Sequence, residues 1–399
     1  MARTLAEAEA LRPAWEALRA CSRRPSLNAD PLRYFATLAS MSGRAEPWIA
    51  TSAAAGRLRA MVVGRLSRRR PAIALGYLRA PAPTLTFLDV VYGGVLAGDQ
   101  PGDADEAAAL LGLALDAGGA SALSINHLAK DAPVRAPALA GPLRSAIEAP
   151  FAPHWRFSLD PQGWEKTMAR FSSKHRYNIK RTDRLLVEHF GGEVETRVFR
   201  TEADLAEFAA GAAPLAARTY QAGLGAAFDD SPQWRSILGA DARAGRMRCY
   251  WLVARGKPIA FQIGSSVGGV YFLESLGYDP DHRDHSPGTV LLLRSYALLA
   301  QEGVRTIDYG FGDAGYKRIY GTESWEESSV RVYGAGAPAA LAAALDRTAE
   351  GISTAARRAM ANGGAIDRVK KAWRKRLTSP APKPKQEPEP PKQPGEERS

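Results

Sequence analysis

The sequence has few of the residues that build disulfide frameworks or metal sites. Its 399 residues include only two cysteines and six histidines, and Cys21 and Cys249 are far apart. The histidines show no Cys/His spacing of the kind that binds zinc, so we expect neither a disulfide framework nor a metal. Two reduced cysteines fit a cytoplasmic protein.

Long apolar runs are also missing. Glutamates interrupt the N-terminal alanines, and Arg294 interrupts the most apolar predicted helix, so we expect no signal peptide and no membrane-spanning helix. The chain does have length and positive charge, with 45% hydrophobic residues and a formal net charge of +11. This composition predicts a globular protein of two domains with a basic surface. That surface either binds phosphates, acidic lipids or nucleic acid, or carries excess positive charge that has no partner.

The clearest pattern runs from Arg248 to Gly321. Apolar runs between turn residues predict three strands: Cys249–Ala254, Ile259–Val267 and Val270–Tyr278. Gly268-Gly269 joins the last two as a hairpin. A helix capped by Ser286, with Pro287 at its first position, then leads to a strand at Val304–Tyr309. A strand–helix–strand unit of this length predicts a right-handed crossover between parallel strands.

The same order of elements occurs earlier, at Leu58–Leu128. Strands are expected at Trp48–Ala53, Leu58–Leu66, Ala72–Leu78 and Leu85–Val91. Tyr92-Gly93-Gly94 and an acidic loop follow, and then a helix at Ala107–Ala117 and a strand at Ala122–Leu128. The repeated pattern indicates a structural duplication, although the two copies share little residue identity.

A connector with a strand (Pro133–Pro161) and a long helix (Trp164–Phe190) separate the two copies. The helix has one basic face, which either is solvated or forms a cradle for an anionic substrate. A second basic segment near the C-terminus, Arg368–Leu377, either lies on an acidic membrane surface or caps the fold. The tail after Ser379 has almost nothing apolar to bury and should be disordered.

The loop before the helix at Pro287 has the features of an anion site. A helix N-terminus presents unpaired amides, and a glycine there lets a phosphate approach the backbone. Arg283-x-x-Ser286-x-Gly288 resembles the pyrophosphate signature of the GNAT acyltransferase superfamily, with serine in place of the first glycine. The resemblance implies a donor-binding set, and the alternative is an ordinary capped helix start. The set comprises Arg283, His285, Ser286, Gly288 and Thr289.

Further segments resemble the CelD-like acetyltransferase family, most clearly between Phe151 and Tyr333. They are Ile259-Ala260-Phe261-Gln262, Gly277-Tyr278-Asp279-Pro280, Ser286-Pro287-Gly288-Thr289 and Asp308-Tyr309-Gly310-x-Gly312-Asp313-x-x-Tyr316-Lys317. That family is associated with bacterial polysaccharide synthesis and is related to Fem-type aminoacyltransferases, which have two GNAT-like halves and use aminoacyl-tRNA. The resemblance implies an α+β protein with two tandem GNAT-like mixed sheets flanked by helices, and acyl-CoA (acetyl-CoA) as donor.

Acyl transfer needs a base for the attacking amine, an acid for the leaving thiolate and positive charge for the oxyanion. Glu274 on a central strand and Asp308 at a strand end are the candidate carboxylates. Tyr316 and Lys317 follow a Gly-rich turn, and similar aromatic-Lys pairs occur in the Fem-type relatives. Each candidate has a structural alternative, because Glu274 fits an arginine partner and Tyr316-Lys317 fits a loop anchor.

The first copy lacks such a site. Its corresponding loop carries acids that would repel a pyrophosphate, so we expect this half to support the acceptor cleft. These acids are Asp99, Asp103, Asp105 and Glu106. We therefore divide the chain into a first GNAT-like half (1–150), a second half that binds the donor (151–335), a basic C-terminal helix (336–378) and a tail (379–399).

The sequence favours a cytoplasmic N-acyltransferase that moves an acyl group from acyl-CoA to an amine on a sugar or another cell-envelope precursor. One alternative is a Fem-like enzyme that uses aminoacyl-tRNA, with the basic helix Lys166–Arg184 binding RNA phosphates. Another is a non-catalytic, membrane-peripheral component of polysaccharide synthesis, held by its basic C-terminal helix.

Overall fold

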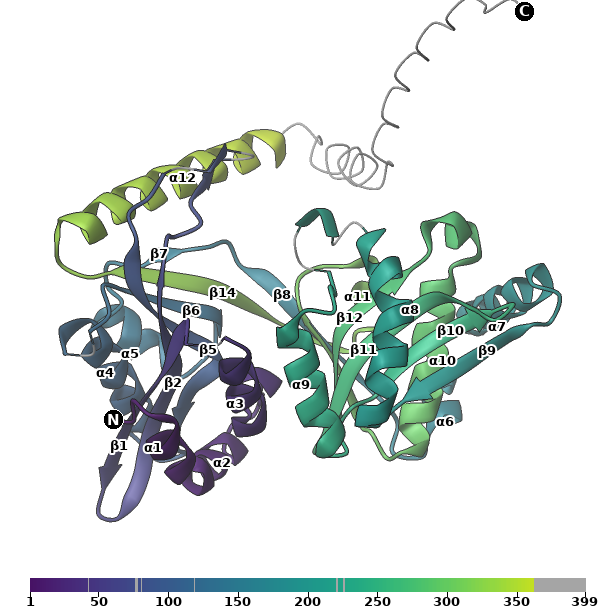
Figure 1. The fold of residues 1–399 in the computed structure, drawn as a ribbon, viewed down its shortest axis with the longest axis horizontal. Helices are drawn as coiled ribbons and strands as arrows, with labels where there is room; N and C mark the ends of the chain where they lie inside the picture. Colours follow the sequence, from purple (N-terminus) through teal and green to yellow (C-terminus); the bar gives the residue numbers. More distant parts are fainter. Residues whose placement is uncertain are drawn as a thin grey trace, which may run out of the picture.

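In the computed structural model the chain forms two halves that share one β-sheet (Figure 1). The structure describes residues 1–361 except 42, 76, 77, 80, 118, 220, 221, 225 and 226. We call residues 1–150 the first half and residues 151–335 the second half. The shared sheet has twelve strands in the order β1-β2-β5-β6-β14-β8-β13-β12-β11-β10-β9, with β7 paired to β14.

The strands of the first half are β1 (Ala45–Ala54), β2 (Arg57–Arg69), β5 (Leu85–Ala97), β6 (Ala122–Ala129) and β7 (Ile147–Glu148). Those of the second half are β8 (Ala152–Ser158), β9 (Val194–Phe199), β10 (Cys249–Ala254), β11 (Lys257–Val267), β12 (Val270–Tyr278), β13 (Thr306–Phe311) and β14 (Glu323–Tyr333). The helices are α1 (Leu5–Ala10), α2 (Arg12–Ala20), α3 (Pro31–Ser40), α4 (Asp103–Asp116), α5 (Arg135–Ala140), α6 (Trp164–Ala169), α7 (Ser173–His189), α8 (Leu205–Ala217), α9 (Pro232–Arg243), α10 (Pro287–Gln301), α11 (Gly315–Tyr320) and α12 (Ala337–Ala361).

The strands of the two halves have the same connectivity. In the first half, β1, β2 and β5 are antiparallel neighbours, and α4 then crosses to β6, which lies parallel to β5. In the second half, β10, β11 and β12 are antiparallel neighbours, and α10 crosses to β13, which lies parallel to β12. The predicted pair of mixed sheets, each with a crossover helix, is therefore confirmed.

Each copy of the strand–helix–strand pattern is followed in the chain by a strand that joins the sheet of the other copy. β8 comes after β6, α5 and β7 of the first copy and pairs with β13 of the second. β14 follows β13 but runs back to pair with β6, and its first residues also pair with β8. In Figure 1, β14 and β8 cross between the two halves, and this exchange makes the two sheets continuous.

The exchange also joins the cores. Helices cover both faces of each half, with α4 and α5 opposite α1 to α3 in the first half, and α7 and α10 opposite α8 and α9 in the second. Val330 and Val332 of β14 are buried in the first-half core, whereas Phe157 of β8 is buried in the second-half core. Burial of such side chains contributes roughly 1.5–3 kcal/mol each.

Local sequence signals explain the ends of several elements. Asp30 caps α3, and its Oδ1 accepts a hydrogen bond of 3.0 Å from the Leu32 amide while Pro31 occupies the first helical position. Gly268 and Gly269 both have positive φ angles, 56° and 77°, as the tight turn between β11 and β12 requires.

Other local expectations were wrong. The long helix expected at Trp164–Phe190 is two helices, because Ser172 caps a new helix through a hydrogen bond from the His175 amide. Ser286 does not cap α10 with its side chain. It takes a left-handed conformation with φ of 52°, and it ends the short 3₁₀ helix Pro280–His285 that precedes α10.

Two expectations in the first half also need correction. The strand expected at Ala72–Leu78 is instead a small separate sheet of β3 (Ala74–Leu75) and β4 (Leu78–Arg79). β5 does not end at Val91 but runs through Tyr92 to Ala97, because Gly93 adopts a φ of 74° and lets the strand bend without ending.

The basic segment Arg368–Leu377 and the tail lie outside the described residues. Within the described part of the chain, no helix has the length and apolar character needed to cross a membrane.

The strand exchange predicts that the halves do not fold independently. A fragment of residues 151–335 lacks β6, the partner of β14, and exposes Val330 and Val332, which are 1% and 2% exposed in the full chain. We expect this fragment to aggregate or to unfold without a cooperative transition. Co-expression with residues 1–150 should restore a cooperative unfolding transition, which circular dichroism measures on heating. A fragment that alone unfolds at the temperature of the full chain would contradict this prediction.

Candidate functional site

A cavity of about 270 Å³ lies where the two halves meet, at the point where β12 and β13 diverge. The last paired residues of these parallel strands are Phe272 and Asp308. Both line the cavity, as do Glu274 and Gly310, two residues further along each strand. The first half supplies Arg24, Pro25, Ser26, Leu27, Asn28, Arg33 and Tyr92.

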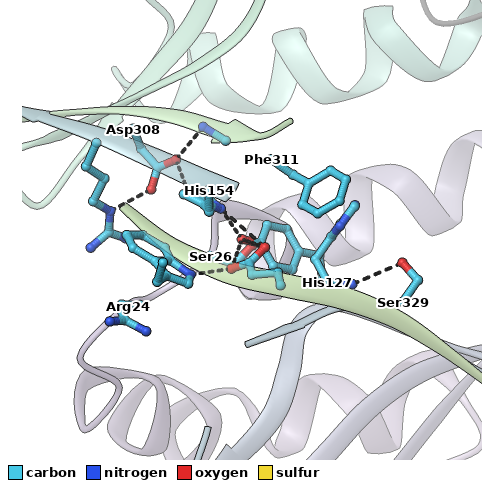
Figure 2. Close-up of polar contacts among 12 residues, drawn as sticks. Arg24, Ser26, His127, His154, Asp308, Phe311 and Ser329 are labelled. Carbon is cyan, nitrogen blue, oxygen red and sulfur yellow. Dashed lines mark hydrogen bonds and ion pairs between the residues drawn. The ribbon is translucent and has the colours of Figure 1, made fainter. Parts of the chain in front are cut away.

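Asp308 is buried in the cavity wall and is held by three hydrogen-bond donors. His154 Nε2 lies 2.7 Å from Asp308 Oδ1, and Arg156 Nε lies 2.8 Å from Oδ2. The backbone amide of Gly310 also donates to Oδ1, at 2.9 Å. Both side chains come from β8, on which alternate residues point to the same face. Figure 2 shows the imidazole of His154 directed at the Asp308 carboxylate.

The other ring nitrogen of His154 faces the first half. Its Nδ1 lies 2.7 Å from the hydroxyl of Tyr92 on β5, which is also 2.9 and 3.0 Å from the two carboxylate oxygens of Glu327 on β14. Trp325 stacks on the imidazole with ring centroids 4.2 Å apart, and its Nε1 donates to Glu327 at 2.6 Å. Asp308, His154, Tyr92 and Glu327 thus form one hydrogen-bonded chain, which we call the seam network.

Burial and charge act in opposite directions on the seam network. Burial raises the pKa of Asp308, but hydrogen bonds from His154 and Arg156 outweigh it and hold that pKa below its ordinary value. Burial lowers the pKa of His154, but the bonds to Asp308 and Glu327 outweigh it and raise that pKa. Burial and the Glu327 carboxylate both raise the pKa of Tyr92. An ionised Asp308 therefore faces an imidazole that readily takes a proton, and Tyr92 keeps its own.

Glu274 lines the cavity, but its carboxylate is already paired with Arg33 of α3. Arg33 is 3% exposed and also contacts Asp241 of α9 at 2.6 Å and Ser265 of β11 at 2.9 Å. Burial lowers the pKa of Arg33, but the two carboxylates outweigh it and raise that pKa. The arginine partner considered for Glu274 is therefore present and comes from the first half.

Tyr316 and Lys317 lie on α11, beside the end of β13. The Lys317 ammonium donates to the carbonyls of Gly310 at 3.1 Å and Phe311 at 2.8 Å, and burial lowers its pKa to about 8. Tyr316 packs edge-on against Tyr309, with centroids 5.4 Å apart. These contacts fit the loop anchor considered for the pair, and they place the Lys317 ammonium behind the Gly310 wall of the cavity.

The five predicted donor-binding residues lie together at the beginning of α10, outside the cavity lining. The ring of His285 stacks on His189 at the end of α7, with centroids 3.8 Å apart, and the Arg283 side chain is exposed. An ideal Cβ on Gly288 would come 2.9 Å from Cδ1 of Tyr278. A side chain at this position would therefore displace the ring of Tyr278.

The corresponding helix start in the first half is closed by its own acids. Asp103 is fully buried and accepts hydrogen bonds from Arg57 at 2.7 Å, from Arg59 at 2.9 Å and from the amide of Gln100 at 3.2 Å. Hydrogen bonds from Arg57 and Arg59 outweigh burial and lower the pKa of Asp103. A carboxylate thus already occupies the beginning of α4, the favourable place for negative charge.

The sequence identified Asp308 and Glu274 but missed four other residues of this region: Tyr92, His154, Arg156 and Glu327. Two signals were available. His154-x-Arg156 and Trp325-x-Glu327 place polar and aromatic side chains on one face of a strand, where an unpartnered charge would be costly. Tyr92 was hidden because Gly93-Gly94 marked a loop.

Residues 173–318 match the sequence model of the family described as Acetyltransferase (GNAT) domain. This protein is an acyltransferase. The matched segment contains the donor-loop candidates, Glu274 and Asp308. His154 and Glu327 lie outside it, as does Tyr92, so the cavity of the acyltransferase draws on parts of the chain that the match does not cover.

Solved structures of similar fold extend over both halves of the acyltransferase. FemX has a TM-score of 0.54 and 12% identity, and the match covers 81% of this chain and 96% of FemX. A tandem GNAT protein from the clavulanic acid biosynthesis pathway has a TM-score of 0.51 and 13% identity, with 82% and 96% covered. At these identities the likeness is one of fold. No curated protein sequence matches the chain.

The charge cluster around Arg33 predicts a large loss of stability on its removal. Arg33→Met leaves the fully buried Asp241 carboxylate with Ser265 as its one side-chain partner among the described residues, so we expect a loss of about 3–5 kcal/mol in the free energy of unfolding. Arg235→Met, which removes a solvent-exposed ion pair with Asp230, is the matched control and should change little. Denaturant unfolding measures the stability of both variants. Equal losses of stability would show that the buried Arg33 cluster contributes no more than a surface ion pair.

Proposed function

We propose that this acyltransferase moves an acyl group from acyl-CoA to an amine on a sugar or another cell-envelope precursor. The observation that carries the proposal is the position of the cavity. It opens where β12 and β13 diverge, and these two strands lie within the segment that matches the acetyltransferase domain, on either side of the crossover helix α10. Diverging parallel strands leave backbone groups unpaired, and these groups are available to bind an extended donor.

The beginning of α10 is the proposed site of the donor phosphates. Arg283, His285, Ser286 and Thr289 bring basic and hydroxyl side chains to a helix start whose first turn contains Gly288. Positive charge and helix-terminal amides favour an anion there. The acyl end would then extend along the gap between β12 and β13 toward the cavity.

The cavity lining supports an acceptor with a ring. Tyr92, Trp234, Phe272 and Trp325 provide aromatic faces, while the charged side chains beside them are largely paired with one another. Apolar faces with a few fixed polar groups are typical of small-molecule sites. Together with the CelD-like resemblance, this favours a cytoplasmic precursor of the cell envelope as acceptor. Peripheral attachment to the membrane stays part of the proposal.

A Fem-like reaction with aminoacyl-tRNA is the second candidate. It is favoured by the exposed basic face of α7, which contains one exposed aromatic side chain, as in many RNA-binding surfaces. These exposed residues are Lys174, Tyr177, Lys180, Arg181 and Arg184. A non-catalytic role is less favourable, because a scaffold has no need for the buried charges of the seam network, which cost free energy to bury.

Calorimetric titration with acetyl-CoA, longer acyl-CoAs and charged tRNA separates these functions. We expect acyl-CoA to bind and charged tRNA not to bind. Transfer assays with amino sugars as acceptors then test the reaction. Binding of charged tRNA without binding of any acyl-CoA would favour the Fem-like function.

Gly288→Asp should weaken acyl-CoA binding by roughly tenfold or more, because a carboxylate would lie close to the donor phosphates. Gly288→Ala is the matched control, since its methyl group meets Tyr278 in the same way but adds no charge. Calorimetry compares the two variants. Equal losses would mean that packing on Tyr278, and not phosphate binding, requires glycine.

Lys317→Met should lower turnover by about 10²-fold while donor affinity is retained, if the ammonium behind Gly310 stabilises negative charge in the transition state. The ammonium loses its proton as the pH rises through about 8, so turnover of the native enzyme should fall there. Lys317→Met should lack this alkaline fall. Arg318→Met, on the exposed face of α11, is the control. Full turnover of Lys317→Met would exclude the role.

A further inference from the structure

The two carboxylates predicted as bases are both engaged. Asp308 is bound by His154 and Arg156, and Glu274 is bound by Arg33. Neither presents a free carboxylate to an amine in the cavity, so the proton of the attacking amine needs another acceptor. We propose that the hydroxyl of Tyr92, supplied by the first half, transfers this proton, and that His154 and Asp308 are its positioning residues. This inference rests on the acyl transfer proposed above.

The backbone of β5 presents Tyr92 to the cavity. The parallel pairing of β5 and β6 ends at Val90 with Ile125, and Tyr92 follows two residues later. This is the same position in the first half that Glu274 occupies in the second, two residues beyond the last pair of β12 and β13. Gly93 lacks a side chain where an ideal Cβ would come 2.5 Å from Cβ of Ser26. The segment from Arg24 to Asn28 therefore closes over the strand and forms a wall beside Tyr92.

The hydroxyl of Tyr92 has two alternative partners. When His154 is neutral and its Nε2–H donates to Asp308, its Nδ1 accepts a hydrogen bond from the Tyr92 hydroxyl. When His154 carries a proton on both nitrogens, Nδ1–H donates to the Tyr92 oxygen, and the hydroxyl donates to Glu327 instead. In both arrangements the Tyr92 oxygen and His154 Nδ1 stay 2.7 Å apart. A proton therefore passes between them without movement of the chain.

The reaction balances with this one relay. The amine nitrogen attacks the thioester carbonyl carbon, a C–N bond forms, and the amine proton moves to the Tyr92 oxygen as the tyrosine's own proton moves to His154 Nδ1. The C–S bond then breaks, and the sulfur takes a proton from Tyr92 while His154 returns its proton to the tyrosine. The products are an amide and a free thiol, and Tyr92 and His154 return to their starting states.

Charges on every side set the conditions for this relay. Asp308 of β13 and Glu327 of β14 stabilise the protonated imidazole, whereas Arg156 of β8 and His127 of β6 oppose it. Glu327 also disfavours a lasting tyrosinate, so Tyr92 passes the proton on and does not hold a negative charge. Because the relay begins with neutral His154, turnover should rise with pH through the raised pKa of His154. Asp308→Asn should move this acid limb to lower pH.

The first test is Tyr92→Phe, which removes one oxygen atom. We expect turnover to fall by about 10²-fold or more, with acceptor KM and donor affinity little changed. Tyr333→Phe is the matched control. It removes a hydroxyl bound to the Asp346 carboxylate at 2.9 Å, and Tyr333 and Asp346 are not among the residues that line the cavity. Native turnover in Tyr92→Phe, or an acid limb that Asp308→Asn leaves in place, would overturn the proposal.

The second test does not depend on acyl transfer. NMR titration of the His154 imidazole should show that Tyr92→Phe changes the pKa of His154, whereas Tyr333→Phe does not. If Tyr92→Phe leaves the pKa of His154 unchanged, Tyr92 and His154 do not share a hydrogen bond, and the relay is overturned whatever the donor. If native enzyme transfers no acyl group from acyl-CoA but the titration responds as expected, the proposed donor is wrong and the hydrogen bond between Tyr92 and His154 stands. The kinetic test is then repeated with charged tRNA.

Discussion

The exchange of β8 and β14 between the two halves is the constraint on which the rest of the structure depends. β8 completes the second-half sheet beside β13, and β14 completes the first-half sheet beside β6. Because each strand is an interior member of the shared sheet, its hydrogen bonds and its buried side chains belong to both halves. The same exchange sets Arg156 opposite Asp308, and His154 opposite Trp325. The seam network is therefore a product of the topology.

Two clusters of paired charges lie at the boundary of the cavity. Arg33 with Asp241 and Glu274 joins α3 to the second half on one side, and the seam network joins β5 to β13 on the other. Buried ion pairs add little to stability when compared with apolar residues of the same size, but a missing partner is very costly. Such clusters therefore fix the relative position of the halves, and the cavity between them keeps its shape.

The duplicated halves differ most at their crossover helices. α4 begins with Asp103, held by Arg57 and Arg59, so its favourable N-terminus is already used by an internal carboxylate. α10 begins after a left-handed Ser286 among histidines and an exposed arginine. The same connectivity thus produces one helix start that is occupied by an internal carboxylate and one that is not. This difference matches the proposed division of labour, with the donor on the second half and Tyr92 contributed by the first.

The sequence by itself determined both crossovers, the Gly268-Gly269 hairpin and most of the strands beside them, because periodicity and turn chemistry act over a few residues. It also indicated Asp308 as a candidate site residue, because a carboxylate stands there at the end of a strand. Only the tertiary structure decided which strands are neighbours at the seam. Tyr92 and Glu327 are 235 residues apart in the chain, yet they share a hydrogen bond. An alternating pattern tells which face of a strand is buried, but not which strand will lie beside it, and the seam network exists only through that choice.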